Sequence, residues 1–218
     1  MIHATDLSKM INKNGGNLLD SISIDDIRPY WRLRLQLLSG DITENEKFQE
    51  EFKSFYGISG IGVNKEFMDN FYQVLENTKQ AERIDFRSMH TAVFGPRPKR
   101  KLSSPQFGFL SKIANLVDPS YPIYDNYVAE LFGFDRPTQT RLESRERLSI
   151  YLEFYNHQRS IYRECVEEGM IKNPITVFKI LLKKYKDDEF PEATLPDMKK
   201  MDYLVAVVAK FKEKQSLV

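Results

Sequence analysis

The chain has 218 residues, of which 41% are hydrophobic, so it is long enough and apolar enough to fold around a substantial core. This composition argues against extended disorder. Its 32 Lys and Arg residues oppose 31 Asp and Glu residues, and the formal net charge of +1 excludes bulk basicity as a means of attracting nucleic acid.

Apolar side chains recur three and four residues apart along most of the chain, which is the spacing of amphipathic helices. This pattern predicts about seven to nine helices, little sheet and an all-α fold. In chain order the stripes are Phe48, Phe52, Phe55 and Tyr56; Phe67, Phe71, Val74 and Leu75; Ile150, Phe154, Ile161 and Cys165; Val177, Ile180, Leu181 and Leu182; and the segment 203–211.

Proline and aspartate mark several helix starts and one division of the chain. Pro174 suits an early helical position, and Asp197 suits the N-cap of the last helix. The prolines between residues 96 and 105 indicate a divider, because Pro and Gly clusters interrupt helices. We therefore expect an N-terminal helical lobe at 1–95 and a second lobe at 96–218, with one compact domain as the alternative.

Cysteine and histidine usage bears on cofactors and compartment. The single cysteine, Cys165, excludes an internal disulfide and any site that needs several cysteines. His3, His90 and His157 are too scattered to suggest a metal site, so we expect neither metal nor cofactor. No apolar run approaches the roughly 20 residues that cross a bilayer. We expect a cytoplasmic monomer that does not contact a membrane.

Positive charge is concentrated in one segment. Residues 86–117 contain six Lys and Arg residues and no Asp or Glu. Four of these cations, Arg97, Lys99, Arg100 and Lys101, surround Pro98 in a predicted loop that could neutralise DNA phosphates. The alternative is an ordinary solvated surface loop.

The segment that follows carries the most informative motif. A helix is predicted from about Phe107 to Val117, followed by a loop bounded by prolines and by another helix that begins near Asn126. Asp125 precedes that second helix, where its carboxylate can accept hydrogen bonds from the first free amides. The alternative for Asp125 is a purely structural N-cap.

Two stretches of this segment, KIANLV from Lys112 and PIYDNYV from Pro122, resemble the core of the HhH-GPD superfamily of DNA glycosylases. They are most similar to a compact bacterial branch with the 8-oxoguanine-DNA-glycosylase fold, over about 26 residues of the chain. The resemblance implies a two-lobed helical fold in which a nucleophilic lysine opens the second helix of a hairpin. By this resemblance Lys112 is that nucleophile and Asp125 is the catalytic aspartate.

The implied activity is that of a bifunctional DNA glycosylase and AP lyase in base-excision repair. Its partner is double-stranded DNA with a modified base, such as 8-oxoguanine. A fixed carboxylate stabilises the positive charge that develops on the sugar as the N-glycosidic bond breaks. A lysine amine in apolar surroundings can attack the sugar C1′ and form a Schiff base.

Further residues are candidates for contacts with DNA. Gly60 and Gly62 lie in a Gly-rich turn whose amides could bind a phosphate, although such a segment can equally be a simple turn. Base flipping needs aromatic faces around the extruded base, and most aromatic residues at helical spacing belong instead to a core. The aromatic candidates for a base pocket are Trp31, Phe107, Phe109, Tyr124 and Tyr127.

Two alternatives to an enzyme remain open. The first is a DNA-binding member of the same fold that lacks catalysis and serves defence or regulation. The second is a helical module that binds another protein, in which Lys112 and Asp125 face different environments.

Overall fold

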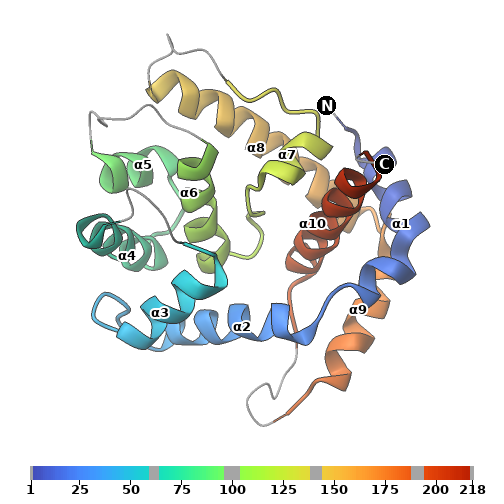
Figure 1. The fold of residues 1–218 in the computed structure, drawn as a ribbon, viewed down its shortest axis with the longest axis horizontal. Helices are drawn as coiled ribbons and strands as arrows, with labels where there is room; N and C mark the ends of the chain where they lie inside the picture. Colours follow the sequence, from blue (N-terminus) through green and yellow to red (C-terminus); the bar gives the residue numbers. More distant parts are fainter. Residues whose placement is uncertain (1, 59–63, 96–103, 138–143, 188–193, 217–218) are drawn as a thin grey trace. The chain divides into compact units, whose positions relative to one another are not determined.

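The computed structural model describes residues 2–58, 64–95, 104–137, 144–187 and 194–216. Within these ranges the chain forms ten α-helices and no strand, which confirms the predicted all-α class. The number of helices is one above the upper end of the expected range of seven to nine. In chain order (Figure 1) the helices are α1 (Ala4–Asp20), α2 (Ile24–Ser39), α3 (Glu46–Phe55), α4 (Lys65–Lys79), α5 (Phe86–Phe94), α6 (Ser104–Val117), α7 (Asn126–Leu131), α8 (Ser144–Glu167), α9 (Lys172–Lys184) and α10 (Asp197–Ser216).

Short polar side chains begin several of these helices. Asn45 caps α3 and Asn64 caps α4, each by accepting a hydrogen bond from the third backbone amide of its helix. Asp85 caps α5, and the hydroxyl of Ser88 donates to its carboxylate at 2.7 Å. The bond from Ser88 is the main cause that lowers the pKa of Asp85 below its ordinary value. Both asparagine and aspartate therefore serve as N-caps in this chain.

The last two helices test the predicted helix starts. Pro174 is the third residue of α9, as its early-helix preference predicts. The prediction that Asp197 is an N-cap is wrong, because α10 begins at Asp197 itself. The backbone oxygen of Pro196 accepts from the amides of Lys199 and Lys200 at 3.0 and 3.1 Å, and the Asp197 carboxylate binds the Lys200 side chain instead.

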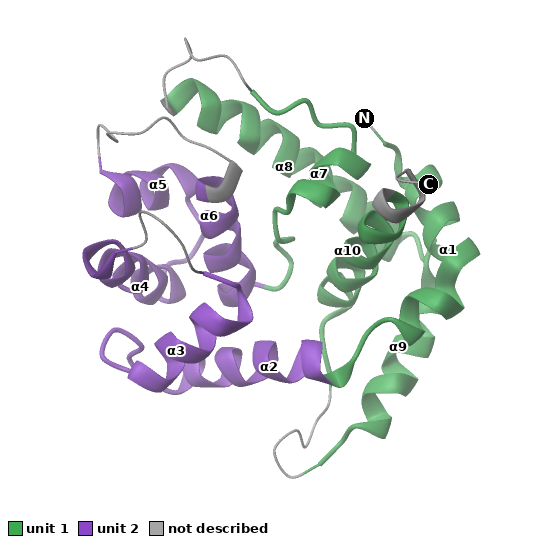
Figure 2. Cartoon of the chain, in the orientation of Figure 1, with its two compact units in different colours: residues 1–24, 119–218 green, residues 25–118 purple. Residues whose placement is uncertain are grey.

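The chain divides into two compact units (Figure 2). Unit 1 comprises residues 1–24 and 119–218, with α1 and α7 to α10, whereas unit 2 comprises residues 25–118, with α2 to α6. The boundary expected at residue 95 therefore lies inside unit 2. Within unit 2, α6 packs against α4 and α5, and within unit 1, α1 packs against α8, α9 and α10. These long-range contacts decide the division, and a pattern of prolines does not encode them.

Unit 2 has an aromatic core centred on Phe52. Its ring centroid lies 5.3 Å from that of Phe71, 5.8 Å from that of Phe48 and 5.9 Å from that of Tyr72. All four side chains are fully buried. Each such ring contact adds about 0.5–1.5 kcal/mol beyond the burial of apolar area, so this cluster fixes α3 against α4.

Helix α2 supports the C-terminal end of α6. The guanidinium of Arg34 donates to the backbone oxygens of Leu116 at 2.7 Å and Val117 at 3.0 Å, two carbonyls that the helix itself leaves without partners. The hydroxyl of Tyr30 donates to the oxygen of Asn115 at 3.3 Å. These contacts hold the C-terminal end of α6 in place, and α6 is the helix that carries Lys112.

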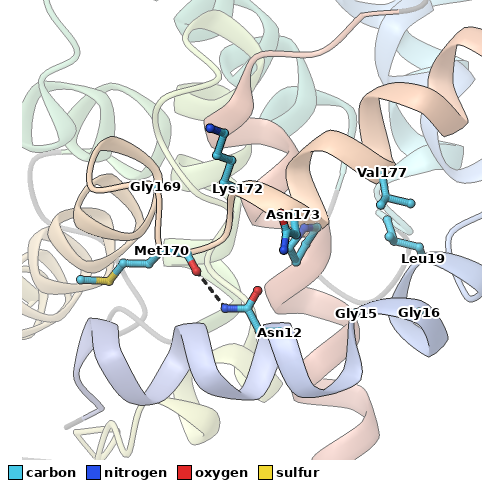
Figure 3. A pocket seen from close by; sticks show the side chains of 10 residues that line it. Asn12, Gly15, Gly16, Leu19, Gly169, Met170, Lys172, Asn173 and Val177 are labelled. Carbon is cyan, nitrogen blue, oxygen red and sulfur yellow. Dashed lines mark hydrogen bonds between the residues drawn. The ribbon is translucent and has the colours of Figure 1, made fainter.

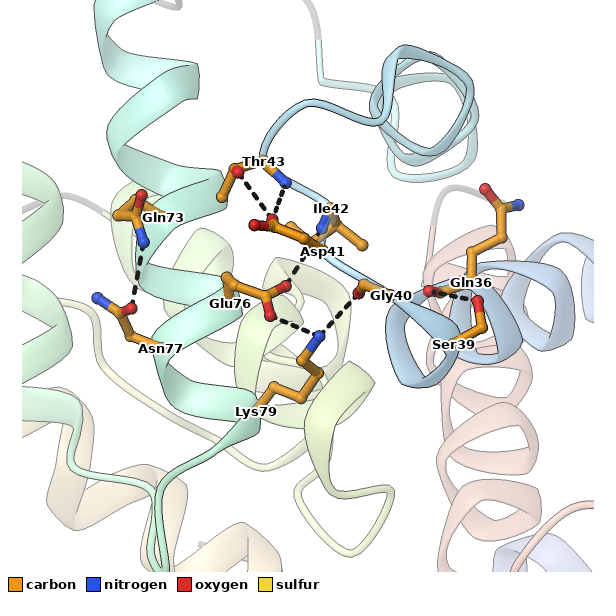
Figure 4. Close-up of polar contacts among 10 residues, drawn as sticks. All are labelled: Gln36, Ser39, Gly40, Asp41, Ile42, Thr43, Gln73, Glu76, Asn77 and Lys79. Atoms are coloured by element: carbon orange, nitrogen blue, oxygen red, sulfur yellow. Dashed lines mark hydrogen bonds and ion pairs between the residues drawn. The ribbon is translucent and has the colours of Figure 1, made fainter.

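A buried carboxylate ties the loop after α2 to α4 (Figure 4). Glu76 accepts the backbone amide of Ile42 at 3.2 Å and pairs with the ammonium of Lys79 at 2.6 Å. Lys79 also donates to the backbone oxygen of Gly40 at 2.8 Å. Beside it, Asp41 accepts two hydrogen bonds from Thr43. The bonds to Glu76 satisfy a buried carboxylate that would otherwise cost free energy.

Unit 1 is built around α1, whose buried side chains include Leu7 and Ile11. Cys165 on α8 is buried against it, with its Sγ 3.5 Å from the backbone oxygen of Ala4. Burial raises the pKa of the Cys165 thiol to about 11. The only cysteine of the chain is therefore a packing residue, because the reactive thiolate is disfavoured.

The imidazole of His90 makes the stability of unit 2 dependent on pH. His90 is buried on α5 beside Phe94, and burial lowers its pKa from the ordinary 6.5. The unfolded chain keeps the ordinary value, so the folded state binds fewer protons, and stability is complete above about pH 6.5 and falls below it. We expect the urea midpoint to decrease between about pH 7.5 and 5.5, measured by fluorescence of Trp31, the only tryptophan, which lies in the same unit.

His90→Gln should flatten this pH dependence, whereas His157→Gln in unit 1 should preserve it. A midpoint for the unsubstituted protein that stays constant over this pH range would contradict the assignment.

Candidate functional site

Lys112 lies in the third turn of α6, and its side chain is half-buried in unit 2. Its Nζ donates a hydrogen bond to the backbone oxygen of Tyr56 at 3.2 Å. The same atom lies 5.4 Å from the centre of the Tyr56 ring and 5.5 Å from the centre of the Phe109 ring, within the range of cation–π attraction. The amine therefore has a defined position and is partly shielded from water.

The position of Lys112 within its helix differs from the one that the resemblance implies. Helix α6 begins at Ser104, eight residues before Lys112, so the lysine does not open the helix. At a rise of about 1.5 Å per residue, the lysine lies about 12 Å along the axis from the helix start. The positive end of the helix dipole acts mainly on the first turn, so it does not bear on this amine.

Asp125 is the N-cap of α7, as the sequence predicts. Its carboxylate accepts hydrogen bonds from the backbone amides of Tyr127 at 2.7 Å and Val128 at 3.4 Å. The side chain is exposed to solvent. Asp125 is thus a fixed carboxylate on the surface of unit 1.

The segment before Asp125 is anchored to α8. The hydroxyl of Tyr155 donates to the backbone oxygen of Pro122 at 2.5 Å. The guanidinium of Arg159 donates to the hydroxyl of Ser120 at 3.0 Å and lies 3.6 Å from the centre of the Tyr121 ring. These contacts restrict the loop that leads into α7, and they position Asp125 through its own backbone.

Lys112 and Asp125 belong to different units of the chain, Lys112 to unit 2 and Asp125 to unit 1 (Figure 2). Their meeting at one site stays a prediction.

The predicted phosphate contacts lie outside the described residues. These are Arg97, Lys99, Arg100 and Lys101 of the basic loop and Gly60 and Gly62 of the Gly-rich turn.

The aromatic candidates for a base pocket fall into two groups. Phe107 is fully buried and stacks on Phe86, with ring centroids 5.8 Å apart, and Tyr124 is buried against residues of α8. Neither ring has an exposed face for a base. Trp31 and Phe109 are half-buried, and Tyr127 is 40% exposed. These three rings keep accessible surface.

A buried charge network in unit 1 was missed by the sequence analysis. Lys199 and Lys200, in the first turn of α10, are 2% and 1% exposed. Lys199 pairs with Asp202 at 2.9 Å, and Lys200 pairs with Asp197 at 2.7 Å and donates to the backbone oxygen of Leu195. The pattern Asp-x-x-Lys and Lys-x-x-Asp at 197–202 is the signal that could have indicated it.

Burial and ion pairing shift the pKa values of Lys200 and Asp197 in opposite directions. Burial is the main cause that lowers the pKa of Lys200 below its ordinary value. Burial would raise the pKa of Asp197, but the hydrogen bonds from Lys200 and Lys179 outweigh it, so that pKa is lowered. The hydrogen bond and the charge of Asp197 raise the pKa of Lys200 and so offset part of the effect of burial.

Asp202 links this network to the segment before Asp125. One carboxylate oxygen binds Lys199, and the other accepts the backbone amide of Ile123 at 3.0 Å. The same side chain therefore compensates a buried cation and fixes the residue two positions before Asp125.

The described part of the chain offers no group of three His, Cys, Asp or Glu side chains that could hold a metal ion. Among its helices, none is long and apolar enough to cross a membrane.

No protein-family model, curated protein or solved structure matches the chain.

Removing the Asp202 carboxylate should destabilise unit 1 strongly. Asp202→Ala leaves the Lys199 ammonium buried without this partner and removes the acceptor for Ile123, so we expect a loss of about 3–5 kcal/mol in unfolding free energy. The measurement is urea denaturation followed by circular dichroism.

Two variants control for this effect. The double variant Lys199→Met, Asp202→Leu should lose less than Asp202→Ala alone, because no buried charge is left uncompensated. Glu167→Gln removes an exposed pair with Arg163 and should change stability by less than about 0.5 kcal/mol. An Asp202→Ala protein as stable as the Glu167→Gln protein would contradict the assignment.

Proposed function

We propose that this protein is a DNA glycosylase with AP-lyase activity, which removes a modified base from double-stranded DNA. Lys112 supplies the nucleophile, and Asp125 supplies the carboxylate that stabilises the transition state. The observation that carries the proposal is the setting of Lys112 on the helix that precedes the Asp125 cap, where its Nζ lies 5.4 and 5.5 Å from the centres of two aromatic rings.

The surroundings of Lys112 hold its amine in a defined position. The backbone oxygen of Tyr56 and the ring faces of Tyr56 and Phe109 orient its Nζ. A reacting group in a defined position avoids much of the entropic cost of bringing two reactants together. Phe109 is itself held by Phe67 and Phe71, with ring centroids 5.4 and 6.0 Å away, so the wall beside the amine is rigid.

The ring faces and the Tyr56 oxygen favour the Lys112 ammonium, so the proposed reaction starts with the loss of one proton from Nζ to solvent. The lone pair of the neutral amine then attacks C1′ of the sugar while the bond from C1′ to the base nitrogen breaks, and the base leaves with the electrons of that bond and takes up a proton from solvent. Positive charge develops on the sugar, and the Asp125 carboxylate stabilises it and accepts the second proton released from Nζ. Ring opening then gives a Schiff base, from which β-elimination breaks the strand.

Asp125 fits this role because its carboxylate is both fixed and accessible. Two backbone amides hold one of its oxygens, and the side chain remains exposed. The contacts of Tyr155, Arg159 and Asp202 with the preceding segment limit its movement. A preorganised charge of this kind needs no reorganisation during the reaction.

The substrate class follows from the proposed chemistry. An enzyme that attacks C1′ has to extrude the nucleoside from the duplex and hold the base between aromatic or apolar faces. Trp31, Phe109 and Tyr127 retain surface for such contacts. An oxidised purine such as 8-oxoguanine is the first lesion to test, since the motif around Lys112 resembles that branch.

Borohydride reduction of the Schiff base provides the decisive test. We expect the unsubstituted protein to give a covalent adduct with lesion-containing duplex, and Lys112→Gln to abolish it. Asp125→Asn should keep the helix cap, as Asn45 and Asn64 do in this chain, and should slow base release by about 10²–10³-fold. The readouts are adduct formation and strand cleavage on denaturing gels.

Lys47→Gln, an exposed lysine of the same unit, serves as the matched control and should form the adduct normally. Absence of any adduct across a panel of lesion duplexes would reject the lyase mechanism. If the protein then still binds DNA and Asp125→Asn binds equally well, the chain is a DNA-binding protein of this kind without catalysis.

A further inference from the structure

We propose that the exposed face of α9 is a second DNA-binding surface, distinct from the Lys112 and Asp125 residues, and that it contacts the phosphate backbone without reading sequence. We define this lysine face as Lys172, Lys183 and Lys184. The choice of DNA as the anionic partner rests on the proposed function.

Helix α9 is the part of unit 1 with the most one-sided charge. Residues 172–186 include five lysines and no Asp or Glu. The nearest acidic residues in sequence are Glu168 and Asp187, which flank this stretch. The other clear concentration of cations, at 86–117, lies in unit 2.

The lysines of this face are available for an external partner. Lys179 is bound to Asp197 at 3.0 Å, and Lys186 lies beyond the end of α9, so both are left out of the definition. Lys172, Lys183 and Lys184 are exposed and form no ion pair with any described residue. From Lys172 to Lys183 the helix rises about 16 Å, over which one DNA strand presents about five phosphates.

The opposite side of α9 is already used for folding. Pro174, Ile175, Phe178 and Leu182 are buried, and the helix packs against α1 and α10. Its exposed apolar side chains are Val177 and Ile180. Two such side chains are too few for insertion into a bilayer, which needs a broad apolar face, so the charge of the lysine face decides what it binds.

A pocket at the N-terminal end of α9 extends this surface (Figure 3). Its volume is about 490 Å³, within the range of ligand sites. Lys172 and Asn173 supply its charged and amide groups, whereas the Nδ2 of Asn12 already donates to the backbone oxygen of Met170 at 2.8 Å. Leu19 and Val177 lie at the end away from Lys172. The polar end suits a phosphate group, and the apolar end suits the sugar edge beside it.

The floor of this pocket consists of helix backbone. Gly15 and Gly16 lie inside α1, where each costs roughly 1 kcal/mol of helix stability relative to alanine. A Cβ at Gly15 would make an ordinary contact with Pro174 at 3.7 Å, and one at Gly16 would meet nothing within 4 Å. Packing therefore does not demand glycine at either position, and the missing side chains leave the pocket open.

The test measures binding of undamaged duplex DNA at increasing NaCl by fluorescence anisotropy. Each phosphate contact that is lost reduces the slope of log K against log salt by about 0.9. We expect the triple variant Lys172→Gln, Lys183→Gln, Lys184→Gln to reduce this slope by about 2–3 and to weaken binding at least about tenfold at low salt. Its thermal melting curve should match that of the unsubstituted protein, because all three side chains are exposed.

A second triple variant, Lys9→Gln, Lys47→Gln, Lys210→Gln, removes the same charge from exposed positions on other helices and should leave the slope within about 1 of the original. Equal losses in both variants would overturn the proposal, since they would reflect net charge alone. An undiminished slope in the α9 variant, no DNA binding by the unsubstituted protein, or binding to phosphatidylserine vesicles instead of DNA would also overturn it. Because the DNA is undamaged, this result is independent of the borohydride experiment on Lys112.

Discussion

The carboxylate of Asp202 is the interaction on which the organisation of unit 1 depends. It compensates the buried ammonium of Lys199 and accepts the backbone amide of Ile123, two residues before Asp125. A buried charge is tolerated only where it is paired and hydrogen-bonded. One side chain therefore joins the start of α10 to the segment that leads into α7. This contact helps to position Asp125, the proposed catalytic carboxylate.

In unit 2 the amine of Lys112 is held in position but is only half-buried. The aromatic core around Phe52 gives α4 and α6 a rigid packing surface, and Phe109 extends that surface to Lys112. The ring faces attract the ammonium, and the backbone oxygen of Tyr56 orients it. The two proposed catalytic groups thus depend on unlike forces, dispersion between rings in one unit and compensated charge in the other.

The local features of the candidate site were largely predictable from the sequence. The helix around Lys112, the loop bounded by prolines and the cap at Asp125 all follow from periodicity and from the preference of aspartate for helix starts. The base-pocket candidates were less predictable, since Phe107 and Tyr124 are core residues. The sequence pattern of an aromatic residue at helical spacing is the same whether its ring faces a core or a ligand.

The sequence by itself determined the all-α class, most helix positions and the cap at Asp125, because these depend on side chains a few residues apart. Only the tertiary structure decided that α1 joins the C-terminal helices, that α6 joins α4 and α5, and that Lys199 and Lys200 are buried. These outcomes depend on contacts between residues far apart in the chain, where burial and charge compensation outweigh local preference.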